Sequence, residues 1–533
     1  MQTMIDANFH RRLAKLSAID ASIWRDRKIG LEKESLRVDS DGGLSKKSHP
    51  AVLGEPLTHP FIKTDYSEAM LELVTPPQPS SAAAVQCLSI LHQHVSEHLA
   101  GELLWPFSMP CVMTPEVQIP IAQYGESNDG QFQSIYRNGL GLRYGRRMQL
   151  IAGVHFNFSL GDHYWQQCHT LLADKREQAL SLSNYMNEQY FAMIRNVHRY
   201  AWVLNYLLGA SPVICKSFLD RDYDWMKPAG PNSVYAQHAT TLRMSDLGYQ
   251  NNQQDSLSIS LDGLPAFCRS LKHAVSTSHP PYAKIGIVEN GDQYRQLNDY
   301  LLQSEAEYYT PVRPKANVVS GVRSLLALQQ QGVRYVELRV VDLQYQSPIG
   351  VDRLTCLFLE LFLQFCHLHP SPVIDQAEHK SLQAERRKVA LAGRDPDIKI
   401  QAKEPIKQAL ADILNACASL AEQISNTTGN VDYQQSVAMM QKRLEDSHQL
   451  PSQSLLDLLS DKQQSFIEFG LAVATNYRHY FEQLFAPGAD TKHWLESAVA
   501  QSRLDQQALS EASKDINFSE FLATHRQQLD NIN

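Results

Sequence analysis

The sequence lacks the motifs that most directly indicate a nucleotide-binding fold. It contains no Gly-x-x-x-x-Gly-Lys-Ser/Thr stretch, so any nucleotide would have to be held by metal ions and by separate arginine and lysine side chains. Gly139, Gly141 and Gly145 lack the strand–turn–helix setting of a dinucleotide-binding loop. We predict that these glycines form a turn.

Cysteine is present, but it follows no pattern. The eight cysteines are scattered over 533 residues, and no two of them form a CxxC pair. The beginning of the chain has no signal-peptide layout, because Arg11, Arg12 and Lys15 interrupt every apolar stretch. Together these features predict free thiols in a reducing compartment, and we expect a cytoplasmic protein.

Long apolar runs and an excess of basic residues are also missing. The two most apolar segments, residues 201–215 and 354–368, are interrupted by Asn205, Pro212 and Glu360. Both are shorter than the ~20 apolar residues of a membrane-spanning helix, so we predict that they are buried core. The chain has 49 basic and 57 acidic residues, a formal net charge of −8, and we expect neither nucleic acid nor a membrane as a partner.

The sequence does contain a change in pattern along its length. Phe9, Leu13 and Leu16 predict an amphipathic helix near the start, and strand-like runs mixed with helices follow as far as about residue 348. After the proline-containing residues 369–372, amphipathic helical patterns predominate. We therefore expect an α+β protein with an N-terminal helix in residues 1–24, a main body in 25–370 and a mostly helical region in 371–533.

Acidic residues alternate with other side chains in one predicted strand, residues 29–38. Side chains in a strand alternate between its two faces, so Glu32 and Glu34 lie on the same side. Two carboxylates so placed repel each other unless a cation lies between them. An isolated Glu-x-Glu is also typical of a solvated strand face, so this pattern needs support from elsewhere in the chain.

Three other predicted strands supply that support. Residues 65–74 carry Glu72 between apolar neighbours, with Asp65 in the approach to the strand. In residues 148–160, Gln149, His155 and Asn157 share one parity and apolar residues share the other. In residues 335–340, Glu337 and Arg339 lie opposite three apolar side chains.

Carboxylate oxygens with one imidazole suit Mg²⁺ or Mn²⁺. We expect activity to depend on such an ion, because the five carboxylates and one histidine have no cation of the protein among them to balance their charge. Arg339 could bind a phosphate or a carboxylate in a bidentate manner. The combination is consistent with a site that activates a carboxylate with ATP and passes it to an amine.

Two histidine-containing segments suggest metal sites. His94-Val-Ser-Glu97-His98 has the H-x-x-E-H spacing of inverted zinc peptidases, but no strong third-ligand segment follows it, and a surface helix is the preferred interpretation. Cys366-His367-Leu-His369 ends an apolar helix before prolines, where histidines commonly contact carbonyl groups or the helix dipole. We predict that both segments are structural.

The chain also resembles a known family, the bacterial glutamate–cysteine ligases of the glutamine-synthetase-like carboxylate–amine ligase superfamily. The resemblance rests on several motifs in family order, which begin with Gly30-Leu-Glu32-Lys-Glu34-Ser-Leu-Arg37. The stretches span roughly residues 25–370 and are residues 30–37, 64–72, 105–111, 122–125, 153–160, 242–249, 309–315 and 335–350. The resemblance implies an antiparallel sheet curled into a funnel with helices outside, and makes residues 25–370 the catalytic domain.

The resemblance also implies roles for individual residues. The implied metal ligands are Glu32, Glu34, Asp65, Glu72, His155 and Glu337. Arg339 and Glu337 would act in catalysis, with Arg339 stabilising the transferred phosphoryl group. The implied substrate-binding residues are Arg243, Gln149 and Asn157 for glutamate, and Tyr249 and Tyr309 for cysteine.

Three functions remain possible from the sequence. The first is the ATP- and Mg²⁺-dependent joining of the glutamate γ-carboxylate to the cysteine amine through a γ-glutamyl phosphate, the first step of glutathione biosynthesis, by a protein that we expect to act as a monomer. The second is a ligase of the same fold that uses another amine. The third is a catalytically silent relative, which is disfavoured because every acidic ligand position is occupied.

Overall fold

The computed structural model describes residues 2–248, 254, 257–291, 293–317, 319, 321–401 and 404–532. Its centre is a seven-stranded antiparallel sheet with the order β11-β12-β5-β1-β3-β2, in which β4 also pairs with β1. The strands are β1 (Arg27–Val38), β2 (Ile62–Thr64), β3 (Met70–Val74), β4 (Leu103–Leu104), β5 (Val154–Leu160), β11 (Val312–Lys315) and β12 (Tyr335–Val341). The path runs from β11 to β2 without returning on itself.

Short strands form three further small sheets away from the central one. These are β6 (Val213–Cys215), β7 (Lys227–Pro228) and β8 (Ser233–Tyr235); β9 (Val288–Glu289) and β10 (Gln293–Tyr294); and β13 (Lys399–Ile400) and β14 (Glu404–Pro405).

Helices surround the central sheet. In the first part of the chain they are α1 (Gln2–Ser17), α2 (Ser22–Arg25), α3 (Ser81–His98), α4 (Asn128–Tyr144), α5 (Asp162–Leu171), α6 (Leu182–Leu208), α7 (Leu264–Ala274), α8 (Pro280–Ala283), α9 (Ser324–Gln331) and α10 (Arg353–Leu368). The later ones are α11 (Gln376–Ala392), α12 (Ile406–Thr428), α13 (Asp432–Glu445), α14 (Pro451–Lys462), α15 (Phe466–Gln483), α16 (Ala489–Ala512) and α17 (Phe518–Gln527). The predicted α+β architecture, with its antiparallel sheet and helical C-terminal region, is confirmed; the division into domains stays a prediction.

The apolar side chains of the strands explain which face the helices cover. Ile29, Leu31, Phe156, Phe158 and Val336 are fully buried, and α3, α6 and α10 pack against the sheet. Lys33, whose side chain points opposite to Glu32 and Glu34, lies 2.7 Å from His92 on α3. The helical layer therefore covers the face opposite to the one that carries the acidic residues.

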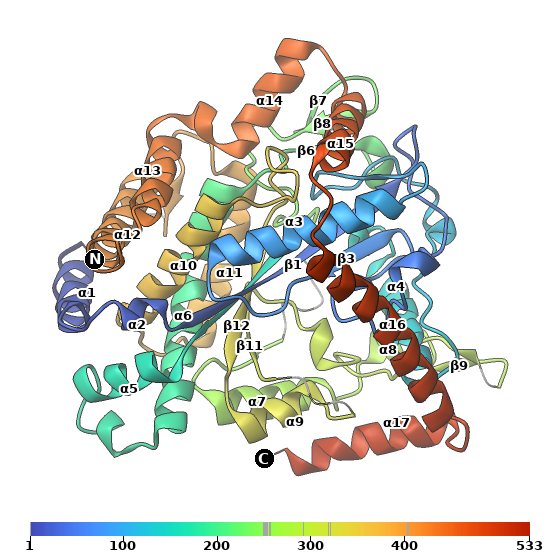
Figure 1. Ribbon diagram of the computed structural model, residues 1–533, viewed down its shortest axis with the longest axis horizontal. Helices are drawn as coiled ribbons and strands as arrows, with labels where there is room; N and C mark the ends of the chain where they lie inside the picture. Colours follow the sequence, from blue (N-terminus) through green and yellow to red (C-terminus); the bar gives the residue numbers. More distant parts are fainter. Residues whose placement is uncertain are drawn as a thin grey trace.

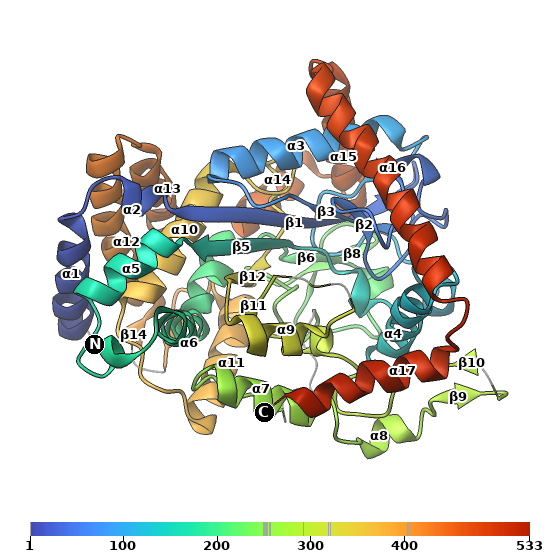
Figure 2. The same cartoon turned by 60° about the horizontal axis from the view of Figure 1, so that its bottom comes forward.

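The two ends of the molecule have different helical layers. α1 packs against α12, which in turn packs against α13, at one end, and α16 and α17 run along the other (Figures 1 and 2). The predicted first helix is confirmed, with Phe9, Leu13 and Leu16 buried. Among the helices of the described residues, none has both the length and the apolar character to cross a membrane.

Two local predictions are wrong. Residues 148–160 do not form one strand, because Met148–Leu150 is a 3-10 turn and β5 begins only at Val154. Gly139 and Gly141 lie within α4, and only Gly145, with φ +85°, ends the helix in a turn. Gly139 is needed there for close packing, since an added Cβ atom would come 2.1 Å from the Gln303 side chain.

Candidate active site

Strand register brings the predicted acidic residues into one row across the sheet. Glu34 of β1 lies opposite Glu72 of β3, and Glu32 of β1 lies opposite His155 of β5. The row continues onto β12, where Glu337 lies opposite Asn157 of β5. Residues directly opposite one another in antiparallel strands have side chains on the same face, so the register alone gathers these groups.

Three of these side chains form a tight group. His155 Nδ1 lies 3.2 Å from Glu32 Oε2 and 3.5 Å from Glu337 Oε1. One ligand atom from each of the three residues lies within 4.8 Å of the others. His155 Nε2 is also 3.9 Å from Glu34 Oε1, so one imidazole lies next to three carboxylates.

Neighbouring polar groups fix the orientation of the carboxylates. Asn157 Nδ2 donates a 2.7 Å hydrogen bond to Glu32 Oε1, and the Gly153 backbone N–H donates a 2.8 Å bond to Glu34 Oε2. Asn157, predicted to lie beside the glutamate substrate, thus contacts a predicted metal ligand directly. Hydrogen bonds of this kind orient side chains that bind a metal ion directly.

Asp65 and Glu72 lie at the β2–β3 side of the group, next to Glu34. The negative charges of Glu32 and Asp65, added to the effect of burial, raise the pKa of Glu72 to about 8. Burial, Asp65 and Glu72 likewise raise the pKa of Glu34 well above its usual value. Positive charges oppose these shifts without cancelling them, from Arg243 and Arg339 on Glu34 and from Lys63 and Arg137 on Glu72.

Glu32 and Glu337, in contrast, have pKa values below the usual one. Burial would raise the pKa of Glu337, but the positive charges of Lys315 and Arg339 bring it far below its usual value. Burial would also raise the pKa of Glu32, and the hydrogen bond from His155 lowers it. Burial lowers the pKa of His155 itself, which favours the neutral imidazole that binds metals.

The expectation that the protein places no cation among these carboxylates is wrong. Lys315 Nζ lies 3.4 Å from Glu337 Oε2, and Arg137 Nη2 lies 3.7 Å from Asp65 Oδ1. Lys315 belongs to β11, which pairs with β12, and Arg137 belongs to α4. The sequence could not reveal either partner, because each comes from an element distant in the chain.

The donor set fits a hard divalent cation. Carboxylate oxygens from Glu32 and Glu337 and a nitrogen of His155 already face one another. Glu34, which is buried, and Glu72, which is half-buried, add carboxyl groups whose ionisation a cation would favour. The observed grouping thus supports the predicted ligand residues Glu32, Glu34, Glu72, His155 and Glu337. Asp65 lies close enough to influence two of them.

Arg243 and Arg339 lie at the β12 side of this row. Arg243 Nη2 donates a 2.9 Å hydrogen bond to the carbonyl oxygen of Arg339, and Arg243 Nη1 is 3.7 Å from Asp342 Oδ1. Asp342 is buried and also accepts bonds from the Ala210 N–H and the Ser211 hydroxyl. Sequence reasoning missed Asp342, whose signal is one carboxylate directly after an apolar strand.

The other predicted substrate-binding residues have different surroundings. Gln149 is buried within the 3-10 turn that precedes β5, not in the strand. The Tyr309 hydroxyl lies 3.4 Å from the sulfur of Met244, next to Arg243 in the chain. Tyr249 lies outside the described residues.

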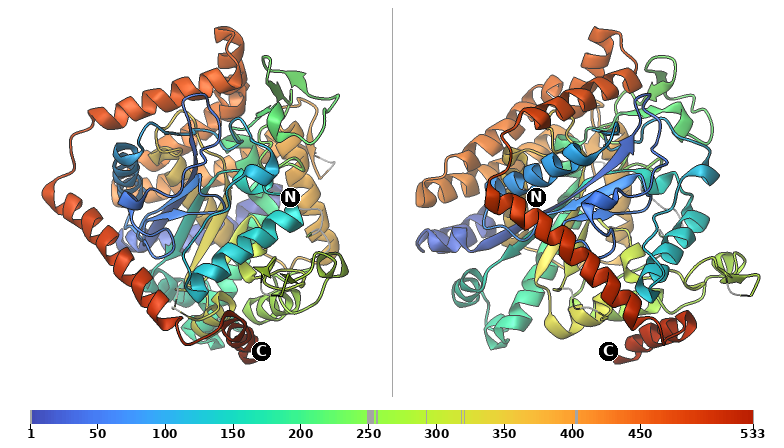
Figure 3. Two further views of the ribbon diagram at one scale, coloured as in Figure 1. Left: turned by 90° about the vertical axis from the view of Figure 1, so that its right-hand side faces the viewer. Right: turned by 45° about the vertical axis from the view of Figure 1, so that its right-hand side comes forward.

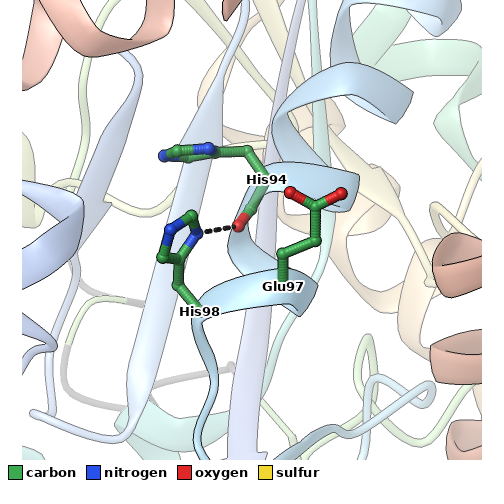
Figure 4. Close-up of side chains that lie close together, drawn as sticks. All are labelled: His94, Glu97 and His98. Carbon is green, nitrogen blue, oxygen red and sulfur yellow. Dashed lines mark hydrogen bonds between the residues drawn. The ribbon is translucent and has the colours of Figure 1, made fainter. Parts of the chain in front are cut away.

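The histidine pair on α3 forms a separate group. One ligand atom each from His94, Glu97 and His98 lies within 4.8 Å of the others. Figure 4 shows the two imidazole rings next to one another, and His98 Nδ1 is 2.7 Å from the carbonyl oxygen of His94 in the preceding turn. The helix is confirmed, and the preference for a structural role over a metal site stays a prediction.

The second histidine segment is packed into the core. His367 is buried with its ring centroid 5.1 Å from that of Trp165, and His369 Nδ1 lies 2.9 Å from the Pro370 carbonyl oxygen. Cys366 is also buried, and all eight cysteines are free. The prediction of free thiols is confirmed, and the structural role of this segment stays a prediction.

Comparison with known proteins places the chain in one family. A family model described as glutamate-cysteine ligase matches residues 13–389. The chain belongs to this family. Glutamate–cysteine ligase of Alcanivorax borkumensis is 39% identical over 96% of this chain and 98% of its own, and that of Azotobacter vinelandii is 38% identical over 97% and 98%.

Solved structures extend the family likeness to the fold. The crystal structure of glutamate–cysteine ligase from Francisella tularensis in complex with AMP is similar, with a TM-score of 0.88 and 29% identity over 95% of this chain and 99% of that one. A bifunctional glutathione synthetase from Pasteurella multocida shares the fold, with a TM-score of 0.71 and 24% identity over 95% of this chain and 58% of that one.

Proposed function

We propose that the protein joins the γ-carboxylate of L-glutamate to the amine of L-cysteine and converts ATP to ADP and phosphate. Family membership supports the reaction class. The observation that carries the proposal is the row of carboxylates and one imidazole, with Arg339 and Arg243 at its end. A site of this kind can hold a triphosphate without a P-loop.

The reaction proceeds in two steps. ATP phosphorylates the glutamate γ-carboxylate, which gives a γ-glutamyl phosphate and ADP. The cysteine amine then attacks the activated carbonyl carbon, phosphate leaves, and the amine loses a proton. Arg339 lies on the same strand face as Glu337, where its guanidinium can stabilise charge on the transferred phosphoryl group.

The residues at the site divide this work between them. Lys315 keeps Glu337 ionised, and Arg243 supplies a positive charge for the glutamate α-carboxylate. Glu32, Glu34, Asp65, Glu72, His155 and Glu337 would hold Mg²⁺ or Mn²⁺. When bound, such ions neutralise phosphate charge during phosphoryl transfer.

ADP release tests the proposal. The purified protein is incubated with ATP, Mg²⁺ and L-glutamate, with and without L-cysteine, and ADP and the peptide product are measured. We expect ADP to appear together with γ-glutamylcysteine in equal amounts, and neither to appear when EDTA exceeds Mg²⁺. Failure to release ADP with L-cysteine would contradict the proposal.

The same assay addresses the alternative acceptor. L-2-aminobutyrate has the backbone of cysteine with a methyl group in place of the thiol. If another amine supports much faster ADP release than L-cysteine does, the protein is a ligase of the same fold for that amine. Comparable rates with L-cysteine and L-2-aminobutyrate would indicate that the site recognises the amino-acid backbone more than the thiol.

A further inference from the structure

Helix α4 lies between the candidate active site and the two C-terminal helices (Figure 2). Both α16 and α17 pack against it. The reaction described so far gives these two helices no part. Two sets of contacts nevertheless connect them to Asp65, one through the loop that precedes α4 and one through the first turns of α4 itself.

The active-site side of α4 carries Arg137. Its Nη2 lies 3.7 Å from Asp65 Oδ1, and its Nε donates a hydrogen bond to the backbone carbonyl oxygen of the same residue. The guanidinium also lies over the ring of Tyr124, with 4.6 Å between its central carbon and the ring centroid. Arg137 is therefore held by two neighbours, an acidic residue of the active-site row and an aromatic ring.

Tyr124 contacts the same acidic segment. It is buried, and its hydroxyl lies 2.6 Å from the carbonyl oxygens of both Thr64 and Asp65. The ring of Tyr124 thus bridges Arg137 and the backbone at Asp65. A shift in the Tyr124 backbone would therefore disturb both partners of the Arg137–Asp65 pair.

Gln506 of α16 holds the backbone of Tyr124 from outside. Its Nε2 donates a 2.9 Å hydrogen bond to the Tyr124 carbonyl oxygen. The next residue, Gly125, has φ +84°, and a Cβ atom added there would come 2.8 Å from Gln506 Nε2. The chain can take this conformation so close to α16 because residue 125 has no side chain.

The first two turns of α4 are attached to the same C-terminal region. The backbone N–H of Asn128 donates a 2.9 Å hydrogen bond to Ser513 Oγ, and its Nδ2 donates a 2.9 Å bond to the carbonyl oxygen of Ile516. One turn later, Phe132 packs against His525 of α17, with ring centroids 4.9 Å apart. The helix that carries Arg137 is therefore fixed at its beginning by α16 and α17.

We propose that Gln506 is a positioning residue, which holds Tyr124 and through it Arg137 against Asp65, an inference that rests on the proposed function. An arginine side chain has several rotatable bonds and keeps one position only where its neighbours fix it. The Tyr124 ring is such a neighbour, and the bond from Gln506 fixes the backbone that carries the ring. The C-terminal helices thus contribute to the active site through α4 and Tyr124.

A double-mutant cycle tests the path from Gln506 to Arg137. The value of kcat/KM for L-cysteine is measured at saturating ATP and L-glutamate in wild type, Gln506→Ala, Arg137→Gln and the variant with both changes. We expect Gln506→Ala alone to lower kcat/KM about five- to tenfold, the loss typical of one hydrogen bond. In the Arg137→Gln background it should change kcat/KM by less than about twofold, because no guanidinium is left to position.

Gln501 on the same helix provides a matched control. It is exposed, and its Nε2 donates a 2.7 Å hydrogen bond to Asp505 of α16 itself. Gln501→Ala should keep kcat/KM within about twofold of wild type. Hydrogen–deuterium exchange adds a measurement that does not depend on turnover. Residues 124–137 should exchange faster in Gln506→Ala than in wild type or Gln501→Ala, while β1 and β5 exchange as before.

Two results would overturn the inference. One is a kcat/KM of Gln506→Ala equal to that of Gln501→Ala, and the other is the same fold loss from Gln506→Ala in wild type and in Arg137→Gln. If Gln506→Ala does not fold, Gln506→Glu decides, since it keeps the shape of the side chain but loses the donor, and it should show the same coupling. No ADP release by wild type would contradict the proposed function, and the exchange measurement would still test the path.

Discussion

Single carboxylates in the active-site row have opposite electrostatic surroundings, although they share one sheet face. Glu337 is held ionised by Lys315 and Arg339, whereas burial, reinforced by the negative charges of Glu32 and Asp65, raises the pKa of Glu72 to about 8. A cation bound between them would therefore change the ionisation of Glu72 much more than that of Glu337. Glu337 is thus ionised with or without a bound cation, whereas the ionisation of Glu72 depends on one.

Removal of one carboxylate at a time tests this arrangement. Glu32→Gln, Glu72→Gln and Glu337→Gln should each fold, because glutamine keeps the shape of the side chain, and each should lose most turnover, by about 100-fold or more. Circular dichroism and ADP release measure the two properties. Glu97→Gln on α3 is the control, and it should keep turnover if the histidine pair there is structural. Unchanged turnover in all three site variants would rule out this metal site.

Arg339 tests the phosphoryl-transfer step. Arg339→Lys keeps the charge but loses the planar fork, so it should reduce kcat by more than it raises the KM for L-glutamate. Steady-state kinetics at saturating ATP separates the two effects. A change in KM alone would instead make Arg339 a carboxylate-binding residue of the ground state.

The residues that could be predicted from the sequence are those whose strand parity decides their face. Glu32, Glu34, His155 and Glu337 follow from alternation alone, because their own strands carry the apolar residues of the opposite face. Lys315 and Arg137 could not be predicted in this way. Each reaches the site from a different element, and only the folded chain brings that element near.

At the scale of elements, the start of β5 sets the position of Arg243. A Cβ atom added to Gly153 would come 2.2 Å from Arg243 Nη2, while the Gly153 N–H donates to Glu34. The chain must leave its 3-10 turn and enter the strand without a side chain at this point. The sequence pattern predicted one continuous strand through residues 148–160, because apolar residues alternate through the 3-10 turn as well as through β5.

Gly153→Ala should therefore displace the Arg243 guanidinium. We expect the KM for L-glutamate to rise about tenfold or more, since the proposed charged contact between Arg243 and the substrate would be weakened, with a smaller change in the KM for ATP. Initial-rate kinetics with each substrate varied in turn measures this. Gly488→Ala is the matched control, because no atom lies within 4 Å of a Cβ atom built there. Equal kinetics in both variants would mean that Arg243 does not need this space.

At the scale of the whole molecule, one buried glutamate joins the sheet to the helices. Glu360 on the apolar helix α10 accepts hydrogen bonds from Arg27 of β1, the Tyr433 hydroxyl of α13 at 2.9 Å and the Ser81 hydroxyl of α3 at 2.5 Å. The sequence showed this glutamate only as an interruption in an apolar run. Glu360 is accommodated in the core because groups from three other elements donate hydrogen bonds to it. No local sequence pattern reveals these partners.

Glu360→Ala should destabilise the fold strongly. It leaves the buried Arg27 without its carboxylate, an effect of ~3–5 kcal/mol for a broken buried pair. Urea unfolding measures the loss, with Glu482→Ala as control, because the exposed Arg478–Glu482 pair contributes only ~0–1 kcal/mol. Equal stability of the two variants would show that Arg27 finds other partners.

The C-terminal helices form hydrogen bonds to segments that come much earlier in the chain. α16 forms a long arm on the outside of the molecule (Figure 3), and its Ser502 accepts a hydrogen bond from the Glu55 backbone N–H and from the Thr58 hydroxyl. Farther along, Gln506 donates to the Tyr124 carbonyl oxygen and the Arg323 N–H donates to Gln528. The C-terminal helices thus fasten segments that lie hundreds of residues earlier.

The order of the strands has a consequence for synthesis of the protein. β1 supplies Glu32 and Glu34, but the row of carboxylates is complete only when β12 supplies Glu337. At the usual 5–20 residues per second, β12 leaves the ribosome roughly 15–60 s after β1. A ribosome that stalls before residue 335 therefore leaves apolar strand faces without their partners, and such a chain is a substrate for chaperones and proteases, not part of an enzyme.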